Sequence, residues 1–333
     1  MSDTATLKTY LDKLDGLPTR LREGLLSVAA ACREIDRRIE MASFTGHMGA
    51  LDQSNIQGET QKALDVIAND LFLLGCGEST AFAGLASEEM DVHWARKDRT
   101  DSPYLLVFDP LDGSSNIEIS APVGSIFSIL PRSKEHVGGP VQEQEFLQPG
   151  IRQVAAGYAL YGAQTLLVFS RGSGVVGFTL DRLEGVWRRS HAEMRVPQRS
   201  NEYAINAANR RHWEPGVRSY VDACEAGASG PLGADRNMRW SGAMVADVHR
   251  ILIRGGIFIY PADRRPGHAN GKLRLLYECS PAGWLIEQAG GRSTDGRTAI
   301  TAIEPSTLHQ RVSVALGSTE DVTAFEAFFG AQQ

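Results

Sequence analysis

The chain has 333 residues, a formal net charge of −6 and a pI of about 5.8, and 42% of its residues are hydrophobic. This length suits two domains, and the composition is that of a globular protein. The lack of a basic stripe argues against nucleic acid as a partner, and no stretch approaches the roughly 20 apolar residues of a membrane helix.

Helical patterns dominate the first part of the chain. Residues 25–39 space their apolar side chains three and four apart, which predicts an amphipathic helix. Residues 46–58 carry Gly, Asn and Gln without a period and predict a loop. Residues 59–74 are again helical in pattern, and Gly75 and Gly77 close that helix.

Strand patterns follow in the middle of the chain. The short apolar run 104–108 predicts a buried strand that enters a turn at 109–115. Residues 123–130 and 164–169 also predict strands, whereas the polar segment 134–150 predicts an exposed connection.

A polar stretch at 194–201, interrupted by Pro197, predicts the boundary between two domains, 1–195 and 196–333. Beyond it, Ser241 is expected to be the N-cap of a helix that runs to Arg254 and stops at two glycines. The run IFIY at 257–260 predicts a strand.

Residues 272–277 predict another strand, and Ser280 with Pro281 predicts the start of a helix that ends at Gly290. Because strands and helices alternate in mixed fashion, the fold class is α/β. The four scattered cysteines form no CxxC pair, and residues 1–15 do not resemble a signal peptide. Reduced thiols and a cytoplasmic location are therefore expected.

The most informative segment is DPLDGSSN at 109–116. Asp109 and Asp112 stand at the end of a strand, where a turn can aim both carboxylates at one point. Gly113 permits unusual backbone angles, and successive N–H groups around Ser114 and Ser115 suit a phosphate. Gathered carboxylate oxygens suit Mg²⁺ or Mn²⁺ rather than zinc. The alternative is a polar turn that binds nothing.

Further acids and bases occur near predicted strand ends. Glu88 and Glu89 follow the apolar run AFAGLA, where they form either a solvated pair or part of a charged site. In the predicted strand from Lys272, period-2 alternation puts Lys272, Arg274 and Glu278 on one face, where they could hold a phosphate and a metal together.

Several segments occur in an order that resembles class I fructose-1,6-bisphosphatase. They are GETQKALDVIAND, ASEE, VFDPLDGSSN, LQPG, AAGYALYG, MVADVHR, GGIFIYPAD and GKLRLLYECSPAGWLIEQAGG. The resemblance extends over nearly the whole chain and implies a layered αβαβα sugar-phosphatase fold with two mixed-sheet subdomains. DPLDGSSN alone would also suit inositol monophosphatases.

The resemblance implies roles for individual residues. Metal ligands would be Glu88, Asp109, Asp112, Glu278 and the carbonyl of Leu111, holding two or three Mg²⁺ ions per subunit, with Mn²⁺ as a substitute. Asp65, Glu89 and Glu59 would be catalytic acids. The 1-phosphate would be held by Asp112, Gly113, Ser114, Ser115, Lys272 and Arg274, and the 6-phosphate by Asn206, Tyr260 and Arg239. Arg239 would reach a neighbouring subunit, which implies a homotetramer or at least a dimer.

Three departures from the family pattern bear on substrate and regulation. Trp240 and Asn209 stand at positions where many members have tyrosines. The pair Arg239-Trp240 resembles forms from Calvin-cycle bacteria, which implies possible use of sedoheptulose 1,7-bisphosphate. Pro103 replaces a lysine of the AMP site, so AMP is expected to inhibit weakly or not at all.

These observations predict a Mg²⁺-dependent enzyme that hydrolyses the 1-phosphate of fructose 1,6-bisphosphate. The alternatives are a phosphatase similar to inositol monophosphatase, which would not need Arg239, and a catalytically inactive metabolite sensor. Every expected carboxylate is present, which argues against the sensor.

Overall fold

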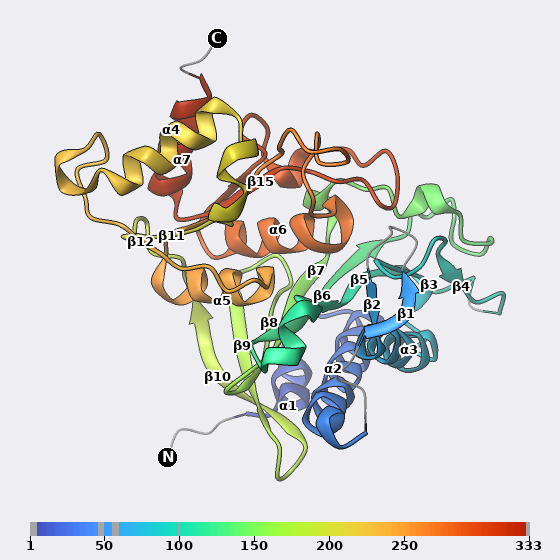
Figure 1. The fold of residues 1–333 in the computed structure, drawn as a ribbon. Coiled ribbons are helices and arrows are strands. Elements are labelled where there is room, and N and C mark those ends of the chain that lie inside the picture. Colours follow the sequence, from blue (N-terminus) through green and yellow to red (C-terminus); the bar gives the residue numbers. More distant parts are fainter. Residues whose placement is uncertain (1–4, 46–49, 55–59, 99, 331–333) are drawn as a thin grey trace.

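The computed structural model of the chain describes residues 5–45, 50–54, 60–98 and 100–330. Helices and sheets alternate in five layers, in the order α, β, α, β, α (Figure 1). The α/β class and the layered αβαβα fold with two mixed sheets are therefore confirmed. Among the described helices, none is long and apolar enough to cross a membrane.

The first layer consists of α1 (Leu7–Asp12), α2 (Thr19–Thr45) and α3 (Ala63–Gly77). The three helices cover one face of the larger sheet, and a hairpin of β1 (Ala50–Ser54) and β2 (Thr60–Lys62) lies beside α3 (Figure 1). Their buried faces include Val28, Cys32 and Phe72, because apolar residues recur along one side of each helix.

The second layer is a sheet with the strand order β10-β9-β8-β7-β6-β5-β3-β4 in the described part of the chain. The strands are β3 (Phe82–Ser87), β4 (Trp94–Ala95), β5 (Tyr104–Asp112), β6 (Val123–Pro131), β7 (Ala155–Tyr161), β8 (Thr165–Ser170), β9 (Val175–Asp181) and β10 (Val186–Met194). β3 and β5 are parallel neighbours that are covered on both faces, so their sequences are nearly continuous apolar runs.

The third layer holds α5 (Met244–Arg254) and α6 (Ser280–Gln288), which lie between the two sheets (Figure 1). The second sheet has the order β12-β11-β13-β15-β14. Its strands are β11 (Glu202–Ala204), β12 (Asn237–Met238), β13 (Ile257–Tyr260), β14 (Arg292–Thr294) and β15 (Val314–Gly317). The outer helices α4 (Pro215–Glu225) and α7 (Thr319–Gly330) contact each other, and α7 packs on β14 and β15.

Two expectations for the first half need correction. The segment 46–58 is not wholly a loop, because β1 forms within it and pairs with β2. The following helix begins at Ala63 rather than at residue 59, since 60–62 belong to that antiparallel pair. Tertiary pairing outweighs the weak helical preference of this short segment. Glu59 lies outside the described residues.

Candidate active site

A cavity of about 580 Å³ is lined by residues from both sheets and from the layer between them. It is lined by Glu88, Glu89, Asp109, Leu111, Asp112, Gly113, Ser114, Ser115, Asn206, Trp240, Gly242, Met244, Phe258, Tyr260, Lys272, Leu273, Arg274 and Glu278. Most of the residues expected at the site from the sequence therefore surround one space, although they come from segments up to about 190 positions apart.

Parallel pairing of β3 with β5 explains why Glu88 lies beside Asp109. Ser87 is the register partner of Phe108, and the Glu88 N–H donates to the Phe108 carbonyl oxygen at 3.1 Å. The carboxyl ends of parallel strands meet at one edge of a sheet. Glu88, which follows β3, and Asp109, near the end of β5, therefore lie at the same edge.

A β-bulge puts Asp109 and Asp112 on the same face of β5. Asp109 pairs with Ile126 and Asp112 pairs with Gly124, so three steps along β5 correspond to only two steps along β6. Residues three apart in a regular strand point to opposite faces, and one extra residue reverses this. The expected turn at 109 therefore begins only after Asp112, since β5 continues to that residue.

Gly113 ends the strand in a conformation that other residues rarely adopt. Its φ is +77°, and a Cβ added there would lie 2.4 Å from the Cβ of Ala243. Both the backbone angle and the close approach require glycine. The short 3₁₀ segment Ser114–Ile119 follows directly, so the chain turns sharply along the cavity wall.

Asp112 caps helix α5 from more than 130 residues away. Its Oδ2 accepts a hydrogen bond from the Val245 N–H at 2.7 Å, at the second helical position. The expectation that Ser241 is the N-cap is wrong, because α5 begins at Met244. The Ser241 hydroxyl instead donates to Asp247 Oδ2 at 2.7 Å.

The expected strand at 272–277 is also wrong. Leu275–Cys279 is a π-helix that continues into α6, and the Cys279 N–H donates to the Arg274 carbonyl at 3.0 Å. The whole segment is buried between layers, so its apolar residues show no usable period. Because the π-helix runs directly into α6, Ser280 lies inside a helical turn, with φ −65° and ψ −48°, and is not an N-cap.

The π-helix, rather than strand alternation, brings Glu278 back to Arg274. Glu278 Oε2 accepts from the Arg274 backbone N–H at 2.6 Å, and Arg274 Nη2 lies 2.5 Å from Glu88 Oε1. Single π-helical turns of this kind often occur at functional sites. Lys272, Arg274 and Glu278 therefore do line one space, but a π-helix rather than strand alternation brings them together.

The carboxylates form one buried cluster that fits a divalent cation. One oxygen from each of Asp109, Asp112 and Glu278 lies within 4.8 Å of the others, and all three residues are buried. Asp109 Oδ1 also accepts from the Leu111 N–H at 2.9 Å. A set of oxygen donors alone suits a hard cation, which would balance the charge of these buried acids when they are ionised.

Burial governs the pKa of each acid in this cluster. It raises the pKa of Asp109 well above the ordinary range, and the charges of Glu88, Glu278 and Asp112 raise it further. Burial likewise raises the pKa of Asp112 to about 6 and that of Glu278 to about 8. Without metal, these three acids therefore keep their protons to a higher pH than exposed carboxyl groups do.

The metal-free protein is expected to lose stability as the pH rises from about 4 to about 8. The pKa values of Asp112 and Glu278 are higher in the folded state than in the unfolded chain, so proton loss at rising pH opposes folding. Melting temperatures at pH 5 and pH 8, each with EDTA and with saturating Mg²⁺, measure this. Mg²⁺ should remove most of the loss, and an equal loss with and without Mg²⁺ would contradict a metal site here.

The far end of the cavity is aromatic. Trp240 stacks on Phe258 with ring centroids 5.8 Å apart and planes 6° apart, and it also contacts Tyr260 at 5.9 Å. Asn206 lies at the start of a 3₁₀ segment and accepts from the Ala208 N–H at 3.2 Å. Four further lining residues are not predicted from the sequence, because only contacts across layers place them here: Gly242, Met244, Phe258 and Leu273.

Two expected residues are described but do not line this cavity. Asp65 is buried in the first turn of α3, and Arg239 has a side chain that is 53% exposed and lies 3.8 Å from Glu202. Their predicted roles stay predictions, as does that of Glu59, which is outside the described residues.

Comparisons with known proteins agree with the fold. The family model for the N-terminal domain of fructose-1-6-bisphosphatase matches residues 12–192, and the model for its C-terminal domain matches residues 196–330. Among solved structures, the chain is similar to the crystal structure of Leishmania major fructose-1,6-bisphosphatase in holo form, with 33% identity and a TM-score of 0.92. That match covers 98% of this chain and 99% of the other. The chain therefore belongs to the fructose-1,6-bisphosphatase family of phosphatases, as its sequence motifs predict.

Proposed function

We propose that the protein hydrolyses the 1-phosphate of fructose 1,6-bisphosphate in a Mg²⁺-dependent reaction that yields fructose 6-phosphate and inorganic phosphate. One observation carries the proposal. The buried acids Asp109, Asp112 and Glu278 converge in the same cavity as the cations Lys272 and Arg274. The carboxylates would hold metal ions that contact the phosphate, and the two cationic side chains would contact the phosphate directly. Together they would bind the phosphate more tightly than either set alone.

The metal site would be held by Glu88, Asp109, Asp112, Glu278 and the Leu111 carbonyl. Two or three Mg²⁺ ions, or Mn²⁺ in their place, would supply Lewis acidity that activates a water and balances phosphoryl charge. Arg274 Nη2 lies 2.5 Å from Glu88 Oε1, so its guanidinium lies between the proposed metal ligands and the proposed phosphate site.

The chain itself would bind the substrate and move the proton. The N–H groups of 113–115, with Lys272 and Arg274, would hold the 1-phosphate. Glu89, assisted by Asp65 and Glu59, would accept the proton of the attacking water. Water oxygen bonds to phosphorus as the phosphorus–oxygen bond to C1 breaks, and the C1 oxygen leaves as a hydroxyl after taking up a proton.

The opposite end would hold the second phosphate through Asn206, Tyr260 and Arg239. Sedoheptulose 1,7-bisphosphate is proposed as a second substrate, because Trp240 forms a flat aromatic wall at this end rather than presenting a tyrosine hydroxyl. Activity on both sugars would suit either gluconeogenesis or the Calvin cycle, in the cytoplasm.

We also propose a division near residue 195, with the metal and 1-phosphate site mainly in 1–195 and the sugar and 6-phosphate site in 196–333. The larger sheet ends at Met194, and the strands of the second sheet begin at Glu202, which supports this boundary.

A phosphate-release assay tests the function. Metal-free protein is supplied with fructose 1,6-bisphosphate, sedoheptulose 1,7-bisphosphate or inositol monophosphate, each with EDTA, Mg²⁺ or Mn²⁺. We expect turnover of the fructose bisphosphate only with metal, and fructose 6-phosphate as the sugar product. A higher kcat/KM for inositol phosphate, or no turnover of any substrate, would refute the proposal.

Mixed oligomers test the proposed homotetramer and its shared site. Arg239→Ala alone should raise KM by roughly 10- to 150-fold, the effect of losing a charged hydrogen bond worth about 1.5–3 kcal/mol. The exposure of the Arg239 side chain outside its own cavity supports a role in a neighbour.

In the mixed sample, Arg239→Ala subunits are combined with Asp112→Asn subunits. Low-KM activity should return, because some sites then receive an intact arginine and intact carboxylates. Absence of recovery in oligomers that mass spectrometry shows to be mixed would count against sharing.

A further inference from the structure

The turn that carries Glu88 and Glu89 is joined to the C-terminal half of the chain by a histidine. The Met90 N–H donates to the Ser87 carbonyl at 3.2 Å, so residues 87–90 form a tight turn at the end of β3. His309 Nε2 lies 2.9 Å from the Met90 carbonyl oxygen, across 219 residues of sequence. A carbonyl only accepts, so the histidine nitrogen donates this bond.

The ring of His309 is fixed by its surroundings. It packs against Tyr277, with ring centroids 5.2 Å apart, and Tyr277 is fully buried one residue before Glu278. Burial lowers the pKa of His309, which favours a neutral ring. The neutral form that bonds to Met90 carries its proton on Nε2 and needs no counter-ion.

The residues next to His309 are bound to residues 273–275, of which Leu273 and Arg274 also line the cavity. The Leu275 N–H donates to the Gln310 carbonyl at 2.7 Å, and the Val312 N–H donates to the Leu273 carbonyl at 2.9 Å. An isolated β-bridge also pairs Arg274 with Arg311. Residues 309–312 thus hold the segment that carries Arg274.

One short segment therefore contacts both sides of the acidic cluster. On one side it holds 273–275, and on the other it reaches the 87–90 turn through His309. The two sides meet directly where Arg274 Nη2 contacts Glu88 Oε1 at 2.5 Å. The relative position of Glu88 and Glu278 thus depends on 309–312 as well as on the sheet.

We propose that His309 is a positioning residue that holds the Glu88–Glu89 turn against Asp109, Asp112 and Glu278 and so sets the affinity of the site for a divalent cation. His309 does not line the cavity and is not a catalytic group. The inference rests on the proposed metal-dependent function. Partners that orient metal ligands commonly contribute about 10- to 100-fold in metal affinity.

The experiment compares His309→Leu, His309→Asn and His309→Gln with the unchanged full-length chain. Leucine removes the donor, asparagine is too short to reach, and glutamine can place an amide N–H near the position of Nε2. Mg²⁺ binding to metal-free protein is measured by calorimetry and by the Mg²⁺-induced rise in melting temperature.

We expect leucine and asparagine to weaken Mg²⁺ binding by about 10-fold or more and glutamine to restore most of it. At saturating Mg²⁺, kcat should recover to near the wild-type value in all three variants, and KM for the bisphosphate should change less than the Mg²⁺ requirement. If leucine fails to fold, the asparagine and glutamine pair still decides the outcome.

Ser102→Ala is the matched control. The Ser102 hydroxyl donates to the Thr80 carbonyl at 2.9 Å, at the opposite ends of β3 and β5 from the acids. The Ser102→Ala variant should have a lower melting temperature and an unchanged Mg²⁺ affinity.

Equal Mg²⁺ affinity in the wild type and in the leucine and asparagine variants would overturn the role of His309, as would a loss of affinity that glutamine does not restore. A wild-type protein that neither binds Mg²⁺ nor hydrolyses the bisphosphate would instead overturn the proposed function itself, and the inference with it.

Discussion

Asp109→Asn is expected to lower kcat by about 10³-fold and to leave the fold intact. Metal ions stabilise transition-state charge by several kcal/mol, and each 1.4 kcal/mol corresponds to a factor of ten. Asparagine keeps an oxygen that can accept from the Leu111 N–H, so the local backbone should not change. Steady-state kinetics at saturating Mg²⁺ and substrate measures the loss.

The variant should also lose most of its Mg²⁺-induced rise in melting temperature. Without metal it should be at least as stable as the wild type at pH 8, because one buried acid of raised pKa is gone. Asp222→Asn is the control, since this acid is 58% exposed and pairs with Arg210 on the surface. Near-normal turnover in a folded Asp109→Asn protein would remove Asp109 from the metal site.

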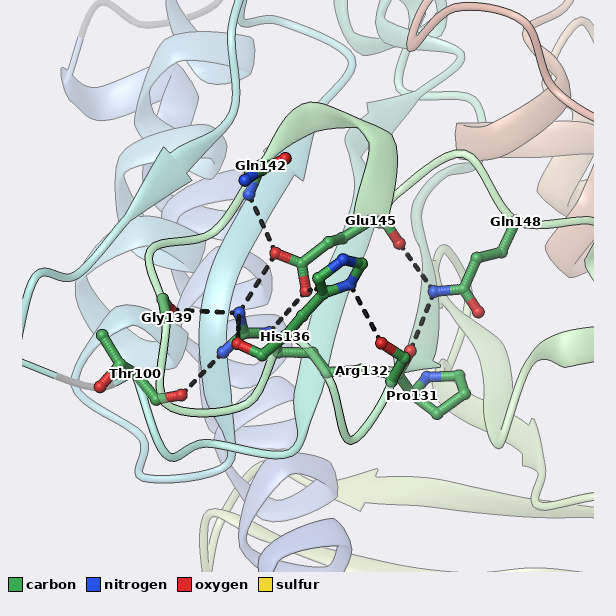
Figure 2. A network of polar contacts seen from close by, with 9 residues as sticks. Thr100, Pro131, Arg132, His136, Gly139, Gln142, Glu145 and Gln148 are labelled. Atoms are coloured by element: carbon green, nitrogen blue, oxygen red, sulfur yellow. Dashed lines mark hydrogen bonds and ion pairs between the residues drawn. The ribbon is translucent and has the colours of Figure 1, made fainter.

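Glu145→Ala is expected to lower the free energy of unfolding by about 3–5 kcal/mol, because it leaves a buried arginine without its partner. The side chains of Arg132 and Glu145 are 0% and 2% exposed, and their two hydrogen bonds are 2.8 and 3.1 Å long. Figure 2 shows the Thr100, His136 and Gly139 carbonyls converging on the same guanidinium. Denaturant unfolding gives the measurement.

The control is Glu193→Ala, which breaks the exposed pair with Arg195 and should cost less than about 1 kcal/mol. Replacing both buried partners, Arg132→Met with Glu145→Leu, should cost less than Glu145→Ala alone. An equal loss in the single and double variants would show that the unpaired charge is not the cause.

The same pair predicts a pH dependence. Burial acts to raise the pKa of Glu145, but the hydrogen bonds from Arg132 and the Gln142 N–H, together with the charges of Arg132 and His136, hold the pKa below its ordinary value of 4.5. The pair therefore stabilises the protein at neutral pH, and its contribution declines as the pH falls below 4.5. In Glu145→Ala, the free energy of unfolding should therefore fall less steeply below pH 4.5 than it does in the wild type, as measured by denaturant unfolding.

This pair also explains an expectation that was wrong in part. The polar segment 134–150 predicts an exposed connection, yet Glu145 and Phe146 in it are buried. Polar composition alone does not reveal that Glu145 has an arginine to neutralise it. Phe146 then packs in the same core cluster as Tyr277, behind the cavity.

Local patterns in the sequence indicate the family, and the resemblance to that family implies the layered fold and most of the cavity residues. DPLDGSSN, the acids after AFAGLA and the GKLRLLYE segment are local patterns, and the apolar runs of β3 and β5 follow directly from burial on both faces. Such signals depend on neighbouring residues only, so a linear sequence contains them.

The way in which these residues come together depends on contacts between distant segments. The bulge that turns Asp109 and Asp112 to one face depends on pairing with β6, and the start of α5 depends on a carboxylate from β5. The π-helix at Leu275–Cys279 and the bond from His309 to Met90 likewise join segments that are distant in sequence. Each depends on a partner that packing supplies, and a periodic pattern in one segment contains no information about that partner.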